Sequence, residues 1–229
     1  MSRRIVVLTA GLSQPSSTRL LADRIAQAAG AEISARGESA EIQVVELREL
    51  AMDMASAMAT GGVPTPKLAK VREAVSAADG IIAVSPVFTA SYSGLFKMFF
   101  DLLDTDALNG MPVVIAATAG TPRHSLVLDH AMRPLFSYLR AVVVPTGVFA
   151  STEDFGDGEA GASLSDRIRR AAAEFAALVV AEKAGVDGFA PAPIDLKKRT
   201  SGVRIDKAVV PFMTMLQGHA GGGGEERQS

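Results

Sequence analysis

Four short and nearly uninterrupted apolar runs recur along the chain: Ile5–Leu8, Ile81–Val84, Val113–Ala117 and Val142–Val144. Each run is too short for a helix and rich in branched residues, and longer stretches with helical spacing separate them. Such runs are typical of parallel strands that are buried on both faces of a sheet. A fifth run, Glu41–Glu46, mixes polar with apolar residues, as expected of a strand at the edge of a sheet.

Helix starts alternate with these strands. Five helices are expected, and hydroxyl side chains can cap the first turn of the first two. Their starts are Ser16 or Ser17, Thr65, Ser93, Ser125 and Ser163. This βα alternation predicts an α/β fold with a doubly wound, five-stranded parallel sheet in the flavodoxin-like order 2-1-3-4-5. In that order Glu41–Glu46 lies at one edge and Val142–Val144 at the other.

The chain of 229 residues is long enough for one such domain, which we expect over residues 1–183. Residues 184–229 remain as a C-terminal extension, which opens on a linker rich in Gly and Pro and carries apolar residues such as Val209 and Phe212. Its last part, Gly221–Ser229, is Gly-rich and charged and is expected to be disordered. We expect the extension to serve docking rather than chemistry.

Composition and charge exclude several function classes. A net charge of −2 gives no attraction to nucleic acid or to an anionic membrane. No apolar run approaches the ~20 residues that span a bilayer. The absence of cysteine excludes disulfides, thiolate metal sites and thiol nucleophiles, and His124, His130 and His219 lack metal-ligand spacing. We therefore expect a cytoplasmic protein without a metal site.

Three loops follow the carboxyl ends of the central strands, where ligands bind in such sheets. The first, Thr9–Arg19, combines hydroxyls and a glycine with a helix start, whose free N–H groups favour a phosphate. It matches neither the dinucleotide motif nor Walker A, so the monophosphate of FMN suits it better. The second loop, 85–94, offers Phe88 as a planar apolar surface, and the third, 118–122, lets a ring approach its backbone. Taken singly, a capped polar loop and ordinary turns explain these residues equally well.

Two segments resemble a known family when they are considered together. Ser85–Lys97 (SPVFTASYSGLFK) is similar to the signature of the NADPH-dependent FMN reductases. Ala117–Thr121 and Leu128–Leu135 are similar to the flavin-reductase partners of two-component monooxygenases. The resemblance covers roughly residues 4–182. It implies hydride transfer from NADPH or NADH to FMN and delivery of reduced FMN to a flavin-dependent, luciferase-like monooxygenase.

The same resemblance implies a flavin site built from the three loops. The first loop would hold the FMN phosphate, and the second and third would contact the isoalloxazine ring. The implied residues are Ser13, Ser16, Ser17, Thr18 and Arg19 for the phosphate, and Pro86, Val87, Phe88, Thr118, Ala119, Gly120 and Thr121 for the ring. Hydride transfer to a flavin needs alignment more than an acid or a base, so no catalytic side chain is expected.

Two other functions remain open. A related enzyme would keep FMN bound and reduce quinones, azo dyes or chromate. A non-enzymatic electron carrier of the flavodoxin type would also bind FMN. Carriers tend to be strongly acidic for docking, and the near-neutral charge of this chain counts against that class.

A strongly apolar helix predicts a homo-oligomer. Between Leu95 and Leu103 only Lys97 and Asp101 are polar, so the helix is apolar around most of its circumference. A surface helix of a monomer would need a wider polar face. We therefore expect a dimer or a tetramer.

The helix that begins near Ser125 is expected to be irregular. Pro134 has no N–H, so a regular helix would leave the carbonyl of His130 unpaired, and a π-bulge would give it another donor. In the two-component reductases that this segment resembles, such a bulge lies at a subunit interface near the flavin. That match implies a contact between His130 and a neighbouring subunit.

Overall fold

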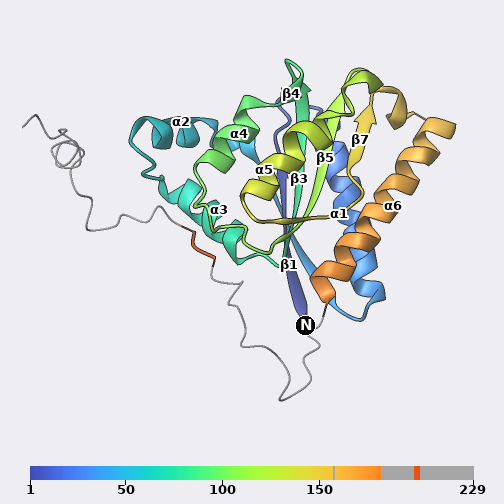
Figure 1. Cartoon of the computed structure of the whole chain (residues 1–229), viewed down its shortest axis with the longest axis horizontal. Coiled ribbons are helices and arrows are strands. Elements are labelled where there is room, and N and C mark those ends of the chain that lie inside the picture. The colour runs from blue at the N-terminus through green and yellow to red at the C-terminus, as the bar shows by residue number, and fades with distance from the viewer. Residues whose placement is uncertain (157, 182–198, 202–229) are drawn as a thin grey trace, which may run out of the picture.

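A parallel sheet forms the centre of the molecule. The computed structural model describes residues 1–156, 158–181 and 199–201. The parallel strands lie in the order β2-β1-β3-β5-β6, and β7 also pairs with β5 (Figure 1). They are β1 (Ser2–Thr9), β2 (Ser39–Glu46), β3 (Gly80–Phe88), β5 (Pro112–Ala119), β6 (Val142–Val143) and β7 (Val148–Ser151). The flavodoxin-like order predicted from the apolar runs is confirmed.

The last predicted strand is divided into two parts. β6 pairs with the start of β5 and β7 pairs with its end. Pro145 lies between the two parts, and a proline has no N–H to donate to the ladder. The sequence pattern predicts only the first part. The second part matters for the site, because its pairing places Ser151 beside Ala119 at the carboxyl end of β5.

Helices cover both faces of the sheet (Figure 1). α1 and α6 pack on one face, and α2, α3, α4 and α5 pack on the other. Ser16 and Thr65 cap α1 and α3, as predicted, and Ser93 caps α4; each hydroxyl accepts a hydrogen bond from the N–H three residues later. The last helix begins at Glu159, four residues before the predicted start at Ser163. The helices are α1 (Ser17–Ala35), α2 (Ala51–Ala59), α3 (Pro66–Ala77), α4 (Gly94–Asp101), α5 (Arg133–Tyr138) and α6 (Glu159–Val180). None of the described helices combines the length and the apolar composition needed to cross a bilayer.

One helix was not predicted. A 3₁₀ turn, Leu47–Leu50, follows β2 and continues directly into α2. No side chain caps either element, so the hydroxyl signal that marks α1, α3 and α4 is missing. The 3₁₀ turn carries Arg48 back toward the first loop, which becomes important below.

Packing within a single subunit explains most of the apolar composition of α4. Phe96, Phe99 and Phe100 are buried in the core, and Leu95 and Met98 pack against it. The helix is apolar around most of its circumference because it lies deep in its own subunit. Its composition therefore no longer argues for an oligomer.

The helix before the last strand pair is irregular, as predicted. Leu128–Met132 forms a π-helix, in which the N–H of Arg133 donates to the carbonyl of Leu128, five residues earlier. The π-turn widens the helix just before Pro134, the residue that cannot donate. His130 lies on this segment with an exposed side chain.

Most of the predicted C-terminal extension lies outside the described residues. Of residues 184–229, only 199–201 are described. Arg199 connects them to the domain, since its guanidinium donates to the carbonyl of Asn109 at 3.1 Å and to that of Ala78 at 2.6 Å. Burial lowers the pKa of Arg199, and the charge of Asp79 opposes that shift.

Candidate functional site

The three predicted loops meet at one cavity. The cavity has a volume of about 320 Å³ and lies at the carboxyl end of β1, β3 and β5. We call it the strand-end cavity. Its lining residues are Leu12, Ser13, Ser17, Thr18, Pro86, Val87, Phe88, Thr118, Ala119, Gly120 and Thr152. Loops that are separated by about a hundred residues in the sequence therefore build a single site.

The first loop presents free N–H groups at the start of α1. In the described part of the chain, the N–H groups of Gln14, Ser16, Ser17 and Thr18 donate to no protein acceptor. Gly11 allows the loop to close this tightly, because a Cβ there would overlap Ser16 Oγ and lie 3.1 Å from Thr18 Cβ. Free N–H groups, the hydroxyl of Ser17 and the positive end of the helix dipole together fit a phosphate.

A hydrogen bond connects the first loop to the third. The hydroxyls of Thr18 and Thr118 lie 2.8 Å apart, and both residues are buried. One hydroxyl donates to the other across a separation of 100 residues. This contact sets the start of α1 against the end of β5, so the first and third loops hold a defined relative position.

The second loop folds into a small hairpin. β4 (Ser91–Tyr92) runs antiparallel to the end of β3. The buried hydroxyl of Ser85 accepts a hydrogen bond from the N–H of Ser93 and donates to the carbonyl of Pro86, which fixes the base of the hairpin. Phe88 remains 45% exposed at the cavity. An exposed aromatic side chain on a fixed loop is a surface on which a flat ring can pack.

The hairpin turn is strained. Thr89 and Ala90 have φ of 48° and 66°, a region that disfavours any residue with a Cβ. We expect Ala90→Gly to stabilise the protein by about 0.5–1 kcal/mol, because glycine removes that strain. Thermal unfolding measures the gain. Ala28→Gly in α1 is the control and should lower stability; a lower melting temperature for Ala90→Gly as well would contradict the strain.

The third loop leaves space at the cavity. A Cβ on Gly120 would meet no atom within 4 Å. The hydroxyl oxygen of Thr121 is buried without a hydrogen-bond partner in the described structure. Small residues and an unpaired oxygen beside the cavity fit a ring system with polar edges, as in an isoalloxazine.

Three of the predicted site residues do not line the cavity. Ser16 caps α1, where its hydroxyl accepts from the N–H of Arg19. The guanidinium of Arg19 turns away and pairs with Asp23 at 2.8 Å and Glu46 at 2.6 Å. These carboxylates engage the guanidinium, and Arg19 does not line the strand-end cavity, where we expect the phosphate. Thr121 lies just beyond the lining, next to Gly120.

Two lining residues were not predicted. Thr152 follows β7, a strand that the apolar pattern did not indicate. Leu12 lies within the predicted first loop but carries no polar group, and its side chain is 55% exposed. Thr152 was therefore missed because the strand before it was not predicted, and Leu12 because it has no group that binds a phosphate.

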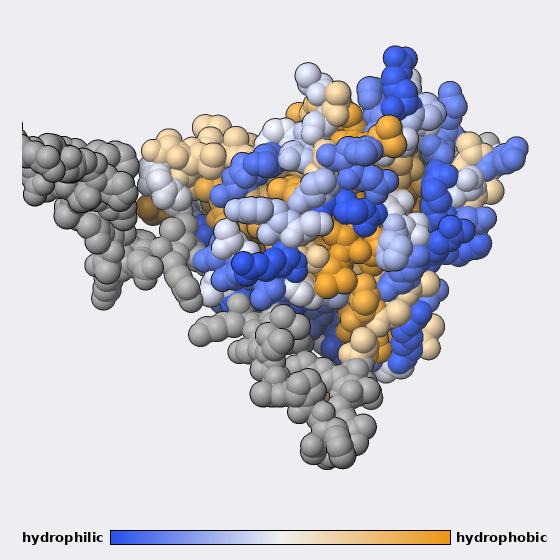
Figure 2. Space-filling model, viewed as in Figure 1, coloured by the Kyte–Doolittle hydropathy of each residue, from blue (hydrophilic) through white to orange (hydrophobic). Residues whose placement is uncertain are grey.

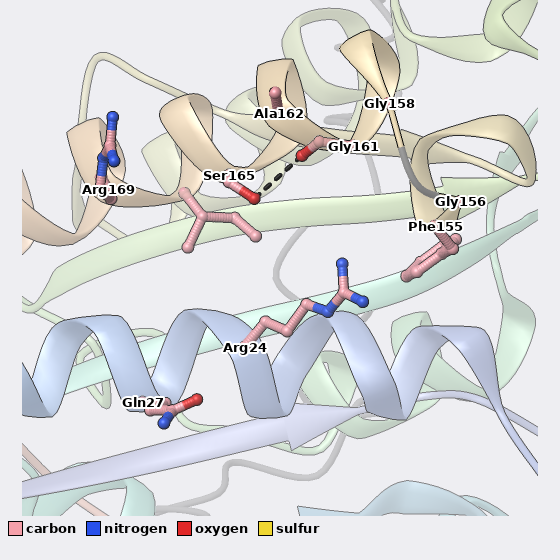
Figure 3. A pocket seen from close by; sticks show the side chains of 10 residues that line it. Arg24, Gln27, Phe155, Gly156, Gly158, Gly161, Ala162, Ser165 and Arg169 are labelled. Atoms are coloured by element: carbon pink, nitrogen blue, oxygen red, sulfur yellow. Dashed lines mark hydrogen bonds between the residues drawn. The ribbon is translucent and has the colours of Figure 1, made fainter.

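A larger cavity lies elsewhere on the molecule. It has a volume of about 420 Å³ and lies between α1 and the start of α6, as Figure 3 shows. Arg24 reaches across it, with its guanidinium carbon 5.6 Å from the centre of the Phe155 ring. None of the three strand-end loops contributes to this cavity, so we do not assign the flavin to it. The described residues also contain no cluster of three His, Asp or Glu side chains arranged to hold a metal ion.

Comparison with known proteins gives consistent matches. A family model described as NADPH-dependent FMN reductase matches residues 3–156. An FMN reductase (NADPH) of Pseudomonas aeruginosa is 40% identical over 178 residues, which cover 76% of this chain and 91% of that protein. The NADH-dependent FMN reductase SfnF of Pseudomonas fluorescens is 41% identical over 181 residues, which cover 78% of this chain and 94% of that protein.

Solved structures agree with these matches. An oxidoreductase from Corynebacterium diphtheriae is 60% identical, with a TM-score of 0.76, and the match covers 78% of this chain and 97% of that one. The apo form of the NADH:FMN oxidoreductase EMOB is 28% identical, with a TM-score of 0.63, and the match covers 74% of this chain and 88% of that one. The chain belongs to the NADPH-dependent FMN reductase family.

Proposed function

We propose that this protein transfers a hydride from NADPH or NADH to FMN in the strand-end cavity and passes the reduced flavin to a flavin-dependent monooxygenase. One observation carries the choice of site. The free N–H groups at the start of α1 and the exposed ring of Phe88 border the same cavity. A phosphate and a flat ring are the two parts of FMN that such a cavity would have to recognise.

Each loop has a separate role in this proposal. Ser13, Ser17 and Thr18 hold the phosphate, through hydroxyls and through N–H groups of the first loop. Pro86, Val87, Phe88, Thr118, Ala119 and Gly120 position the ring, with Thr152 at its border. FMN, when bound, accepts the hydride at its own ring, so the protein supplies binding and alignment. No side chain needs to donate or remove a proton.

Loss of the first-loop hydroxyls tests the phosphate role. We expect Ser17→Ala/Thr18→Ala to raise the dissociation constant of FMN about tenfold or more, because hydrogen bonds to a charged group are lost. Binding of riboflavin, which lacks the phosphate, should change much less. Fluorescence titration measures both affinities. Ser165→Ala is the matched control, since Ser165 bonds only a carbonyl of its own helix. Equal losses of affinity for FMN and for riboflavin would show that this loop does not bind the phosphate.

Delivery of reduced FMN to a monooxygenase rests on the resemblance of the third-loop region to two-component reductases. Family membership favours an enzyme over an electron carrier. A reductase that releases flavin should purify nearly colourless and should reduce added FMN through many turnovers. A yellow protein that retains FMN through gel filtration and reduces a quinone instead would support the alternative, an FMN-bound quinone, azo or chromate reductase.

We also propose that the protein is a homodimer or a homotetramer and is cytoplasmic, with residues 1–183 as the reductase domain. Exposed apolar side chains support the oligomer. Leu126 and Tyr138, on either side of the π-helix, are 63% and 73% exposed. Figure 2 shows a further apolar area between α5 and α6, and β6 and α6 carry the exposed Val142 and Leu178.

Deletion of His130 tests the role of the π-helix. The deletion should convert the π-turn into regular helix, because it removes the one extra residue in the turn. If the π-helix packs against another subunit near the flavin, the variant should retain FMN more tightly and reduce free FMN several-fold more slowly. Steady-state assays measure the rate of FMN reduction, flavin absorbance measures the retained FMN, and light scattering measures the assembly state. A deletion variant with wild-type assembly and turnover would contradict the interface role.

A further inference from the structure

Arg48 binds the first loop from outside the strand-end cavity, which it does not line. Its Nη1 donates to the carbonyl of Ser13 at 3.2 Å. Its Nη2 pairs with Glu46 at 2.5 Å. When the Gln14 amide is oriented to satisfy both of its ends, its oxygen accepts from Nη2 of Arg48 at 2.5 Å as well. Arg48 therefore binds two consecutive residues of the loop.

The charge of Arg48 is already balanced. Glu46 accepts from Arg48 through one carboxylate oxygen and from Arg19 through the other. Asp23 provides a second carboxylate to Arg19. These side chains line a separate cavity on the outer side of the loop, together with Ser13 and Gln14, and Arg48 does not line the strand-end cavity. Arg48 thus acts on the loop rather than on a ligand in that cavity.

The geometry of the peptide after Ser13 links the contact with Arg48 to the direction of the Gln14 N–H. The peptide bond between Ser13 and Gln14 is trans. In a trans peptide the C=O and the following N–H point in opposite directions. Because Arg48 holds the Ser13 carbonyl, the Gln14 N–H points away from Arg48, and Ser13, on the other end of the same peptide, lines the strand-end cavity. That N–H donates to no protein acceptor in the described structure.

We infer that Arg48 is a positioning residue that gives the site its preference for a flavin with a terminal phosphate. It fixes the orientation of one peptide and so presents an N–H to the phosphate without contacting it. Without Arg48, the peptide is free to rotate, and the same loop offers one donor fewer. Ring binding by the second and third loops does not depend on this contact. The inference rests on the proposed flavin site and names the residue that sets its selectivity.

The test compares FMN with riboflavin in three variants of the full chain. Arg48→Met removes the donors and leaves Glu46 paired with Arg19. Arg48→Lys keeps a charge that can reach the Ser13 carbonyl. Arg36→Met is the matched control, since Arg36 also binds a carboxylate, that of Glu32, and backbone carbonyls, those of Glu32 and Ala173, but at the other end of α1. Fluorescence titration gives the two dissociation constants for each protein.

We expect Arg48→Met to weaken FMN binding about tenfold and riboflavin binding less than about twofold. Arg48→Lys should recover part of the FMN affinity, and Arg36→Met should match the wild type for both flavins. Equal losses for both flavins in Arg48→Met, or no loss for either, would overturn the inference. Ser17→Ala distinguishes a failure of the phosphate site from a failure of the role of Arg48. If it lowers the preference for FMN and Arg48→Met does not, Arg48 has no such role while the phosphate site stands. A wild-type protein without any preference for FMN would refute both.

Discussion

Substitution of Gly11 by alanine is expected to weaken FMN binding on the order of tenfold to a hundredfold. The new methyl group would overlap Ser16 Oγ and crowd Thr18 Cβ. Overlap of this kind costs about 1–3 kcal/mol in a packed environment. The loop relieves it by displacing Ser16, which caps α1, so the N–H groups at the helix start lose their arrangement. Riboflavin should lose less affinity, because it makes no use of those groups.

Measurement of this effect needs a control for folding. Gly94 lies at the first position of α4, and a Cβ there meets no atom within 4 Å. Gly94→Ala should therefore leave the melting temperature and the FMN affinity close to the wild-type values. A folded Gly11→Ala variant with unchanged affinity for FMN would show that the close approach of the loop is not needed for binding.

Asp104 and Arg72 are expected to give the largest effects on stability. Arg72 belongs to α3 and is 1% exposed, and its guanidinium nitrogens have no hydrogen-bond partner among the described residues. Burial lowers the pKa of Arg72, while the nearby charge of Asp104 raises it. Asp104→Asn removes that opposing charge and should lower the free energy of unfolding by about 1–2 kcal/mol, less than the loss of a direct ion pair, because the two side chains interact through their charges without a hydrogen bond.

Substitution of Arg72 itself should affect stability differently from substitution of Asp104. Arg72→Met removes the buried charge and keeps an apolar side chain of similar length, so it should be neutral or stabilising by about 1 kcal/mol. In the double variant the loss caused by Asp104→Asn should largely disappear, because no buried cation remains. Urea unfolding of the four proteins measures the coupling. Additive effects in the double variant would exclude an interaction between the two residues.

We expect flavin selectivity and stability to depend on different parts of this chain. Only a few atoms of the first loop are expected to bind the phosphate. Close contacts at Gly11 and the hydrogen bond between Thr18 and Thr118 hold this loop in place. The second loop keeps a strained turn beside an exposed aromatic ring. Strain of this kind is retained where a conformation serves binding. Relief of the strain at Ala90 is therefore expected to raise stability without a parallel gain in FMN affinity.

Much of the fold was predictable because its signals are local. A buried parallel strand needs an apolar run, and a helix start needs a capping hydroxyl, so both are visible over a few residues. The caps at Ser16 and Thr65 were found in this way. The π-turn was also predictable, since a single proline removes a specific donor from the helix. Elements without such signals, α2 and β7, were not found.

The sequence alone determined the sheet order, the three loops that meet at its carboxyl end and the family of the chain. The tertiary structure decided which side chains reach the cavity. Arg19 lies at the end of the first loop in the sequence, yet two carboxylates, from α1 and β2, hold its guanidinium away from the strand-end cavity. Arg48 comes from an unpredicted turn and binds the loop instead. A long charged side chain takes the partners that surround it in the fold, and those partners come from distant segments, so local sequence does not determine its direction.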